Sequence, residues 1–272
     1  MFFDKMNQYS LLIILVFGVN IQAAFSAAGS NHNADLLPSR ITHSNDLTSF
    51  LSQLKTADRE ISLQLGGFTA HQGRTQNIYI DGLIGDRFAV AQHSDSNGLV
   101  GIGYYLHPQE SNPLNLSYGV NAFYLAKTNV SGVVIQEMLF TNLGYYYPTT
   151  NYPIYFAAKA LVKNPENTPF NLILDAGIGP NIIKTGTVRE TSLDGGLTIP
   201  DQTFSGRTTA VFSAMGGVGV RINHVFGQAP LECGYRFFYL GQGSFNRLTN
   251  QILNSLSSGS SYANALLCSI VV

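Results

Sequence analysis

From Glu60 onward, the chain alternates apolar residues with small or polar ones at every second position. The clearest segment covers residues 114–127, where the apolar side is made by Leu114, Leu116, Tyr118, Val120, Ala122, Tyr124 and Ala126. The residues between them are mostly Asn, Ser and Gly, and residues 61–66, 170–179 and 210–223 repeat the pattern. Because side chains alternate between the two faces of a strand, the spacing predicts strands with one apolar face and one small, polar face.

The polar face of these strands distinguishes a membrane barrel from a soluble sandwich. A soluble sandwich turns its apolar face inward and normally carries charge outside. Asp, Glu, Lys and Arg make up only 11% of this chain, against about 25% in ordinary soluble domains. Gly, Ser and Asn suit the inside of a narrow barrel whose apolar face meets lipid, and lipid cannot satisfy an open sheet edge. The sequence therefore predicts an all-β protein, a closed antiparallel up-and-down transmembrane β-barrel.

The positions of the strand-like segments indicate eight strands. They are expected at residues 60–71, 97–107, 114–127, 152–163, 170–184, 207–224, 230–241 and 260–272. Long connections alternate with short ones, as in outer-membrane barrels with large external loops and tight periplasmic turns. Residues 78–90 and 135–147 are also strand-like, although they fall inside expected loops. We interpret them as strand extensions above the membrane; the alternative is an extra pair of strands, which would make ten.

The first residues of the chain predict export. Lys5 precedes an apolar run at residues 11–17, and small residues follow at positions 23, 24 and 26–28. This is the pattern of a secretory signal peptide, expected to cover residues 1–28. Export and a barrel together predict the outer membrane of a Gram-negative bacterium.

A separate N-terminal segment is expected at residues 29–59, on the periplasmic side. It contains one short amphipathic helix ending near Arg59, because helical spacing relates Leu47, Phe50, Leu51 and Leu54. The barrel itself is expected to cover residues 60–272.

Seven charged residues on the polar strand faces are expected inside the barrel: Lys127, Lys159, Lys163, Asp175, Arg221, Glu232 and Arg236. Charges in such an interior must pair or meet water. One interpretation is that the two acids bridge neighbouring Arg and Lys residues and close the lumen. The other is a narrow, weakly cationic passage, since five of these residues are basic and two are acidic.

The two cysteines are predicted to lie opposite each other. If residues 230–241 and 260–272 form a flush hairpin, opposed residues have a constant sum of residue numbers, and Cys233 and Cys268 meet this condition. Both are expected on the outer face near the periplasmic end. The oxidising periplasm favours a disulfide. The alternative is two free thiols, because a bridge between directly opposed strand residues is strained.

No catalytic, cofactor-binding or metal-ligating residue is predicted. Hydrolysis at the external rim of a barrel requires a His with a Ser or acidic partner within hydrogen-bond reach. His93 lies beside Ser94, but adjacent residues of an extended chain face opposite ways. His71 ends the first strand near the outer rim and has no partner at strand spacing. We therefore expect that the protein is not an enzyme.

Four segments carry a resemblance to known proteins: IDGLIGDRF (80–88), LSYGVNAFYLAKT (116–128), DAGIGPN (175–181) and GQAPLECGYRFFYLGQG (227–243). They resemble uncharacterised, paralogous barrel proteins of intracellular gammaproteobacteria. More broadly, the barrel resembles the small OmpA-like and opacity-like outer-membrane proteins of Gram-negative bacteria. The resemblance implies location and fold, and it supplies no catalytic residue or cofactor. The chain ends Ser269-Ile270-Val271-Val272, where the wider group usually ends in an aromatic residue.

Two roles fit these observations. The first is a structural or surface-interaction role, displaying four long external loops at residues 72–96, 128–151, 185–206 and 242–259. The second is a narrow porin-like channel for small or apolar solutes. The expected partners are outer-membrane lipid and lipopolysaccharide, the outer-membrane assembly machinery, and an external ligand or host partner bound through the loops. With 15 basic and 16 acidic residues, the chain lacks the positive charge that nucleic-acid binding requires.

Overall fold

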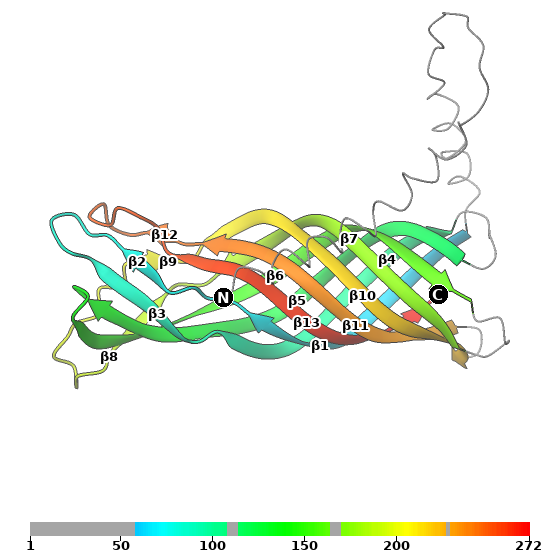
Figure 1. Cartoon of the computed structure of the whole chain (residues 1–272), viewed down its shortest axis with the longest axis horizontal. Coiled ribbons are helices and arrows are strands. Elements are labelled where there is room, and N and C mark those ends of the chain that lie inside the picture. Colours follow the sequence, from blue (N-terminus) through cyan, green and yellow to red (C-terminus); the bar gives the residue numbers. More distant parts are fainter. Residues whose placement is uncertain (1–57, 108–113, 164–169, 227–228) are drawn as a thin grey trace, which may run out of the picture. The chain divides into compact units, whose positions relative to one another are not determined.

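The computed structural model describes residues 58–107, 114–163, 170–226 and 229–272, which form a closed β-barrel (Figure 1). Eight antiparallel strands make the ring: β1 (Asp58–His71), β4 (Ser94–His107), β5 (Leu114–Gln136), β6 (Phe140–Val162), β7 (Phe170–Thr185), β10 (Thr208–Phe226), β11 (Ala229–Ser244) and β13 (Ser257–Val271). Each strand bonds to the next around the ring, and β1 bonds to β13 from Ser62 opposite Val271 to His71 opposite Tyr262. The predicted up-and-down barrel of eight strands is confirmed.

Five short strands lie outside this ring, at its outer end: β2 (Gln76–Ile78), β3 (Asp86–Gln92), β8 (Arg189–Ser192), β9 (Phe204–Ser205) and β12 (Asn246–Arg247). β2 pairs with β3, which pairs with the upper part of β5, while β8 pairs with the upper part of β6 and β9 pairs with β12. The strand-like residues 78–90 therefore belong largely to a separate small hairpin and not to a ten-stranded ring.

The prediction of a loop at residues 128–151 is wrong, because most of these residues belong to strands. β5 and β6 each run for 23 residues and continue far past the ring as one hairpin. Its turn contains Glu137 and Met138, whose φ angles of 49° and 58° are those of a tight type I′ turn. The strands continue because inward side chains such as Val134 and Tyr145 are buried in an apolar cluster above the membrane. Residues 135–147 are thus strand extensions, as interpreted from the sequence.

The start of the barrel differs slightly from the prediction. β1 begins at Asp58, so the last two residues of the expected periplasmic segment belong to the barrel. The signal peptide at 1–28, the rest of the segment at 29–59 and the helix predicted there lie outside the described residues. Within the described part of the chain, no helix is both long and apolar enough to cross a membrane.

The outer wall of the ring is apolar, as the alternation predicts. Leu65, Phe156 and Leu266 point away from the lumen, with exposed fractions of 68%, 72% and 70%. A closed ring satisfies every strand edge, and an apolar wall suits hydrocarbon, which together make the architecture of an outer-membrane barrel. The protein is an outer-membrane β-barrel. Its long connections lie together at one end, which we call the outer end, and we call the opposite end the periplasmic end.

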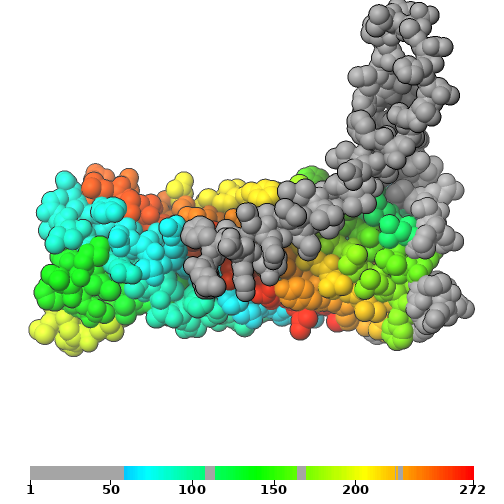
Figure 2. Space-filling view, viewed as in Figure 1, coloured from blue at the N-terminus to red at the C-terminus, as the bar shows by residue number. Residues whose placement is uncertain are grey.

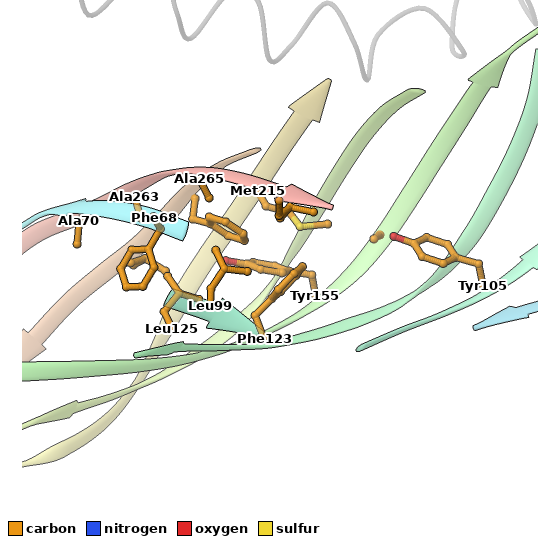
Figure 3. Packing of buried hydrophobic residues seen from close by; sticks show 14 residues of the cluster. Phe68, Ala70, Leu99, Tyr105, Phe123, Leu125, Tyr155, Met215, Ala263 and Ala265 are labelled. Carbon is orange, nitrogen blue, oxygen red and sulfur yellow. The ribbon is translucent and has the colours of Figure 1, made fainter. Parts of the chain in front are cut away.

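Side chains fill the lumen in layers. Figure 3 shows the apolar layer, in which Phe123 and Tyr155 converge from neighbouring strands. The Phe123 and Phe238 rings meet edge to face, with centroids 5.2 Å apart, and Tyr155 lies beside Phe238 at 6.1 Å. An eight-stranded barrel has an interior just wide enough for side chains to occupy, and this layer occupies it.

Glycines bring β10 and β11 close together below the apolar layer. Gly219 lies opposite Gly234 in the register. A Cβ atom at Gly234 would lie 2.5 Å from the Cα atom of Gly219 and would also collide with the carbonyl oxygen of Val218. Neither contact is with a flexible side chain, so the backbone itself would have to move.

We predict that Gly234→Ala destabilises the folded barrel by about 1–3 kcal/mol, because overpacking forces a backbone shift. The matched control is Gly216→Ala on β10, where the nearest atom to the new Cβ is 3.9 Å away. The refolded protein is unfolded in urea, and the folded fraction at each urea concentration is read from its mobility on an unheated gel. The unfolding midpoints of the two variants are then compared. Equal unfolding midpoints for the two variants would contradict the prediction.

Candidate functional site

A cluster of buried charges fills the periplasmic half of the lumen. Lys159 on β6 lies between two carboxylates, with Nζ 2.8 Å from Glu60 Oε1 and 3.0 Å from Glu232 Oε2. All three side chains are buried. The Lys159 ammonium also lies 4.3 Å from the centre of the Tyr105 ring, a distance at which a cation is attracted to the aromatic face. Glu60 on β1 and Glu232 on β11 are thus joined across the barrel through one lysine.

Arg221 and His107 complete this group, which we call the ionic cluster (Glu60, His107, Lys159, Arg221 and Glu232). Arg221 Nη2 lies 2.9 Å from Glu60 Oε2, and its Nε donates to Glu232 Oε1 at 2.7 Å. His107 Nε2 lies 2.9 Å from the same Glu60 oxygen. Both carboxylates therefore contact both cations, so the ionic cluster joins β1 and β11 to β6 and β10.

A second ion pair lies next to the ionic cluster. Arg236 on β11 forms a salt bridge with Asp175 on β7. Its Nη1 also donates to Gln64 Oε1 at 2.6 Å, and Gln64 donates in turn to Asn121 at 3.1 Å. The Arg236 guanidinium lies 5.4 Å from the centre of the Phe123 ring, at the base of the apolar layer.

Among the described residues, the ion pairs of the lumen join three carboxylates to three cationic side chains. Glu60, Asp175 and Glu232 are bonded to Lys159, Arg221 and Arg236. Buried charges are costly unless they are paired and hydrogen-bonded. Each of these charges has an ionic partner, and among their buried oxygens Asp175 Oδ1 is left without a hydrogen bond. A cavity beside Asp175, Glu232 and Arg236 has a volume of only about 20 Å³, which is room for about one water molecule. The arrangement can cross-link the strands, and it leaves little space for a solute.

One of the seven charged residues predicted for the lumen lies on the outer face. Lys127 is exposed, because a β-bulge between Leu125 and Thr128 adds a residue to β5 and turns Lys127 to the outer face. Lys163 is half-buried directly after the end of β6. The surplus of basic charge expected inside the barrel is therefore smaller than predicted, because Lys127 lies outside and Glu60 adds a carboxylate.

Sequence reasoning missed two members of the ionic cluster. Glu60 belongs to the inward set of β1 together with Ser62 and Gln64, so extending the two-residue period one step toward the N-terminus would have found it. His107 continues the inward set of β4 that includes Tyr105. Both lie at strand ends, where the alternation has too few residues to be recognised.

The two cysteines face each other in the ladder between β11 and β13. Cys233 is directly opposite Cys268, with Cα atoms 4.1 Å apart, and a disulfide joins them in the structure. Cys268 is exposed on the outer wall. The bridge therefore ties the strand before the last connection to the strand that closes the ring.

His71 has a partner that the sequence did not reveal. Its Nδ1 lies 2.7 Å from the hydroxyl of Ser94, which is directly opposite on β4. The partner comes from strand register and not from spacing along one strand. The ring of His71 stacks on Tyr262, and the nearby carboxylate of Asp95 accepts a hydrogen bond from the backbone N–H of Asn129. His71 and Ser94 thus form part of the contacts that hold neighbouring strands together at the outer rim.

The outer connections form a single body, which we call the outer cap (residues 72–93, 137–142, 186–207 and 245–256). The first connection bonds to the fourth, where Leu253 N donates to Tyr79 O at 2.9 Å. It also bonds to the second, where Ile84 N donates to Glu137 Oε2 at 3.0 Å.

The other contacts complete a ring. The third connection bonds to the second, where Leu193 N donates to Asn142 O at 2.7 Å, and to the fourth, where Leu248 N donates to Thr203 O at 2.9 Å. Each connection is therefore fixed to two neighbours. Figure 2 shows the cyan first connection and the green hairpin side by side at the outer end.

Aromatic side chains fill the inside of the outer cap. Phe88 packs against Tyr145 and Phe204, with ring centroids 5.1 and 5.7 Å apart, and Tyr147 packs edge to face on Phe245 at 4.8 Å. These residues come from all four connections and their strands. The cap thus has its own apolar core, separate from the apolar layer of the lumen.

Carboxylates lie close together in the cap. Burial raises the pKa of Asp86, and the neighbouring carboxylates of Glu137 and Asp201 raise it further. Burial also raises the pKa of Glu190, with Asp201 adding to the effect. These carboxylates therefore raise one another's pKa, and Asp86 and Glu190 take up protons at a higher pH than ordinary carboxylates do.

Comparisons with known proteins give similarity of fold. No family model and no curated protein matches the chain. The barrel is similar to Neisserial surface protein A, with 12% identity over 79% of this chain and 96% of that chain and a TM-score of 0.40. The outer membrane protein OprG from Pseudomonas aeruginosa is 12% identical over 79% of this chain and 97% of that chain, with a TM-score of 0.46. The outer membrane protease OmpT from Escherichia coli is 9% identical over 79% of this chain and 96% of that chain, with a TM-score of 0.39. Likenesses at this level carry no argument about what the chain does.

We predict that Lys159→Met destabilises the barrel by about 3–5 kcal/mol, because the buried carboxylates of Glu60 and Glu232 lose the cation between them. The matched control is Lys127→Met, which changes an exposed lysine and should shift the stability by less than about 0.5 kcal/mol. Urea unfolding in the same lipid or detergent measures both. Similar losses for the two variants would refute the role of the ionic cluster.

We predict that the exported protein carries the Cys233–Cys268 bridge. Alkylation of unreduced, unfolded protein followed by mass spectrometry should label neither cysteine, and reduction beforehand should allow both to be labelled. Two labelled thiols without reduction would show that the cysteines are free.

Proposed function

We propose that this protein has a surface-interaction role, in which a closed barrel holds the outer cap ready to contact a partner outside the cell. The observation that carries the proposal is the ring of hydrogen bonds joining the four outer connections around an aromatic core. A surface that is already ordered loses less conformational freedom when it binds. Connections that served only to link strands would need no such core.

The filled lumen supports the same proposal. The neutral ionic cluster, the pair of Arg236 and Asp175, and the apolar layer around Phe123 lie in succession along the barrel. Passage of a hydrated ion would require several of these contacts to break together. The narrow channel remains the alternative outcome, and it would need the layers to rearrange.

The remaining assignments follow from the sequence pattern. We propose that residues 1–28 are removed as a signal peptide, that the chain up to β1 stays in the periplasm, and that the outer-membrane assembly machinery inserts the barrel. Lipid and lipopolysaccharide would surround its wall. We assign the protein no catalytic activity, since the interactions of His71 and Ser94 are explained by their place at the rim.

Conductance of the refolded protein in a planar bilayer tests the proposal. We expect no steady openings, because charged and aromatic side chains occupy the lumen. The same preparation must move faster on an unheated gel than on a heated one, so that silence reflects a folded barrel. Steady openings from the folded protein would support the channel and overturn the surface-interaction role as the main function.

A further inference from the structure

Large apolar side chains stand at the tips of all four outer connections. We call them the apolar tips: Leu83, Ile84, Leu139, Phe140, Leu193, Leu197, Ile199, Leu248 and Leu253, each at least 55% exposed. Leu197 and Ile199 reach 87% and 79%. Single exposed apolar residues are ordinary, but a set of them concentrated at one end of a molecule indicates a contact surface.

The apolar tips lie far from the membrane that the barrel spans. From Tyr124, on the outer wall of the ring, β5 continues for 12 residues to its end at Gln136. At about 3.3 Å per residue and a tilt near 40°, this places the tip of the hairpin about 30 Å further out. The tips cannot be buried in the same membrane, so their partner must approach from outside.

The backbone at the tips suits an apolar partner that offers no hydrogen bonds. The N–H groups of Leu83, Leu139, Leu193, Leu248 and Leu253 donate to carbonyl oxygens within the cap. That of Ile84 donates to the carboxylate of Glu137. Six of the nine tip residues can therefore enter a lipid interface without leaving a backbone donor unsatisfied, which is the condition that lipid imposes.

Charge near the tips identifies the kind of lipid surface. Asp81, Glu137, Asp194 and Asp201 lie within two residues of an apolar tip, so the tips are flanked mainly by carboxylates. Arg247, beside Leu248, directs its guanidinium to the carbonyl oxygens of Ile252 and Leu253. An anionic bilayer would repel such a surface, whereas a neutral, zwitterionic bilayer would not.

We propose that the apolar tips insert together into the surface of a neutral phospholipid bilayer other than the bacterium's own. The proposal rests on the surface-interaction role, and it names lipid as the partner. The cap would act as a rigid support in which each connection adds two or three apolar side chains to the contact. Four separate tips distribute the contact around the rim of the cap, which fits a flat lipid surface.

The absence of tryptophan from the sequence allows a direct test. Phe140→Trp places a single fluorophore at a tip that is 59% exposed. The variant is held in lipid nanodiscs and mixed with phosphatidylcholine vesicles whose acyl chains carry bromine quenchers. We expect a blue shift and strong quenching, because the indole enters the vesicle. The matched control, Tyr146→Trp on β6 six residues from Phe140, should show neither. An unquenched Phe140→Trp would overturn the proposal.

A second comparison checks that insertion provides the affinity. Replacing Leu83, Ile84, Leu139 and Phe140 by Asn should weaken vesicle binding by at least about tenfold, because four apolar side chains no longer leave water. The control replaces Asn250 and Gln251, exposed polar residues of the fourth connection, by Ser and should bind as the unchanged protein does. Equal binding by all three proteins would contradict the proposal.

Two further outcomes separate the alternatives. Tighter binding to vesicles of phosphatidylglycerol than of phosphatidylcholine would overturn the charge argument. Association of the nanodiscs with one another without vesicles would mean that a second copy of the chain covers the tips. If vesicles fail to bind while the barrel is silent in the planar bilayer, the lipid partner is wrong and the surface-interaction role stands. Steady conductance would instead refute the proposed function itself.

Discussion

The pairing of β1 with β13 is the constraint on which the rest of the structure depends. Hydrocarbon supplies neither donors nor acceptors, so the first and last strands of the ring must satisfy each other. With only eight strands, the closed ring is narrow, and its interior accepts few large side chains. The glycines at 219 and 234 follow from this, because two strands approach there so closely that a Cβ atom would strike backbone.

A narrow interior also determines how charge is arranged. An isolated Lys159 would be very costly in this environment, and its position between Glu60 and Glu232 removes most of that cost. Because these residues belong to β6, β1 and β11, the same contacts cross-link strands that are far apart around the ring. The ionic cluster is therefore a structural consequence of closure, and the balance of its charges leaves no electrostatic preference for a passing ion.

Much of the fold could be predicted because alternation is a local property. The period of two identified the ring strands, and register alone placed Cys233 opposite Cys268. Lys127 was assigned to the wrong face because one bulge reverses the alternation, and no composition signal marks it. The outer cap was beyond reach for a different reason. Its contacts, such as Leu253 with Tyr79, join residues far apart in the chain, and nothing in either local sequence indicates the other.

The barrel and the outer cap are stabilised by different forces. Within the membrane, apolar side chains on the wall gain nothing by leaving water, so hydrogen bonds and interior packing must hold the ring. The cap stands in water, where burial of Phe88, Tyr147 and Phe245 provides the usual hydrophobic stabilisation. The cap has this source of stability, and it nevertheless leaves the side chains of Leu197 and Ile199 exposed to water. Their exposure is better explained by a contact that forms only when the partner arrives.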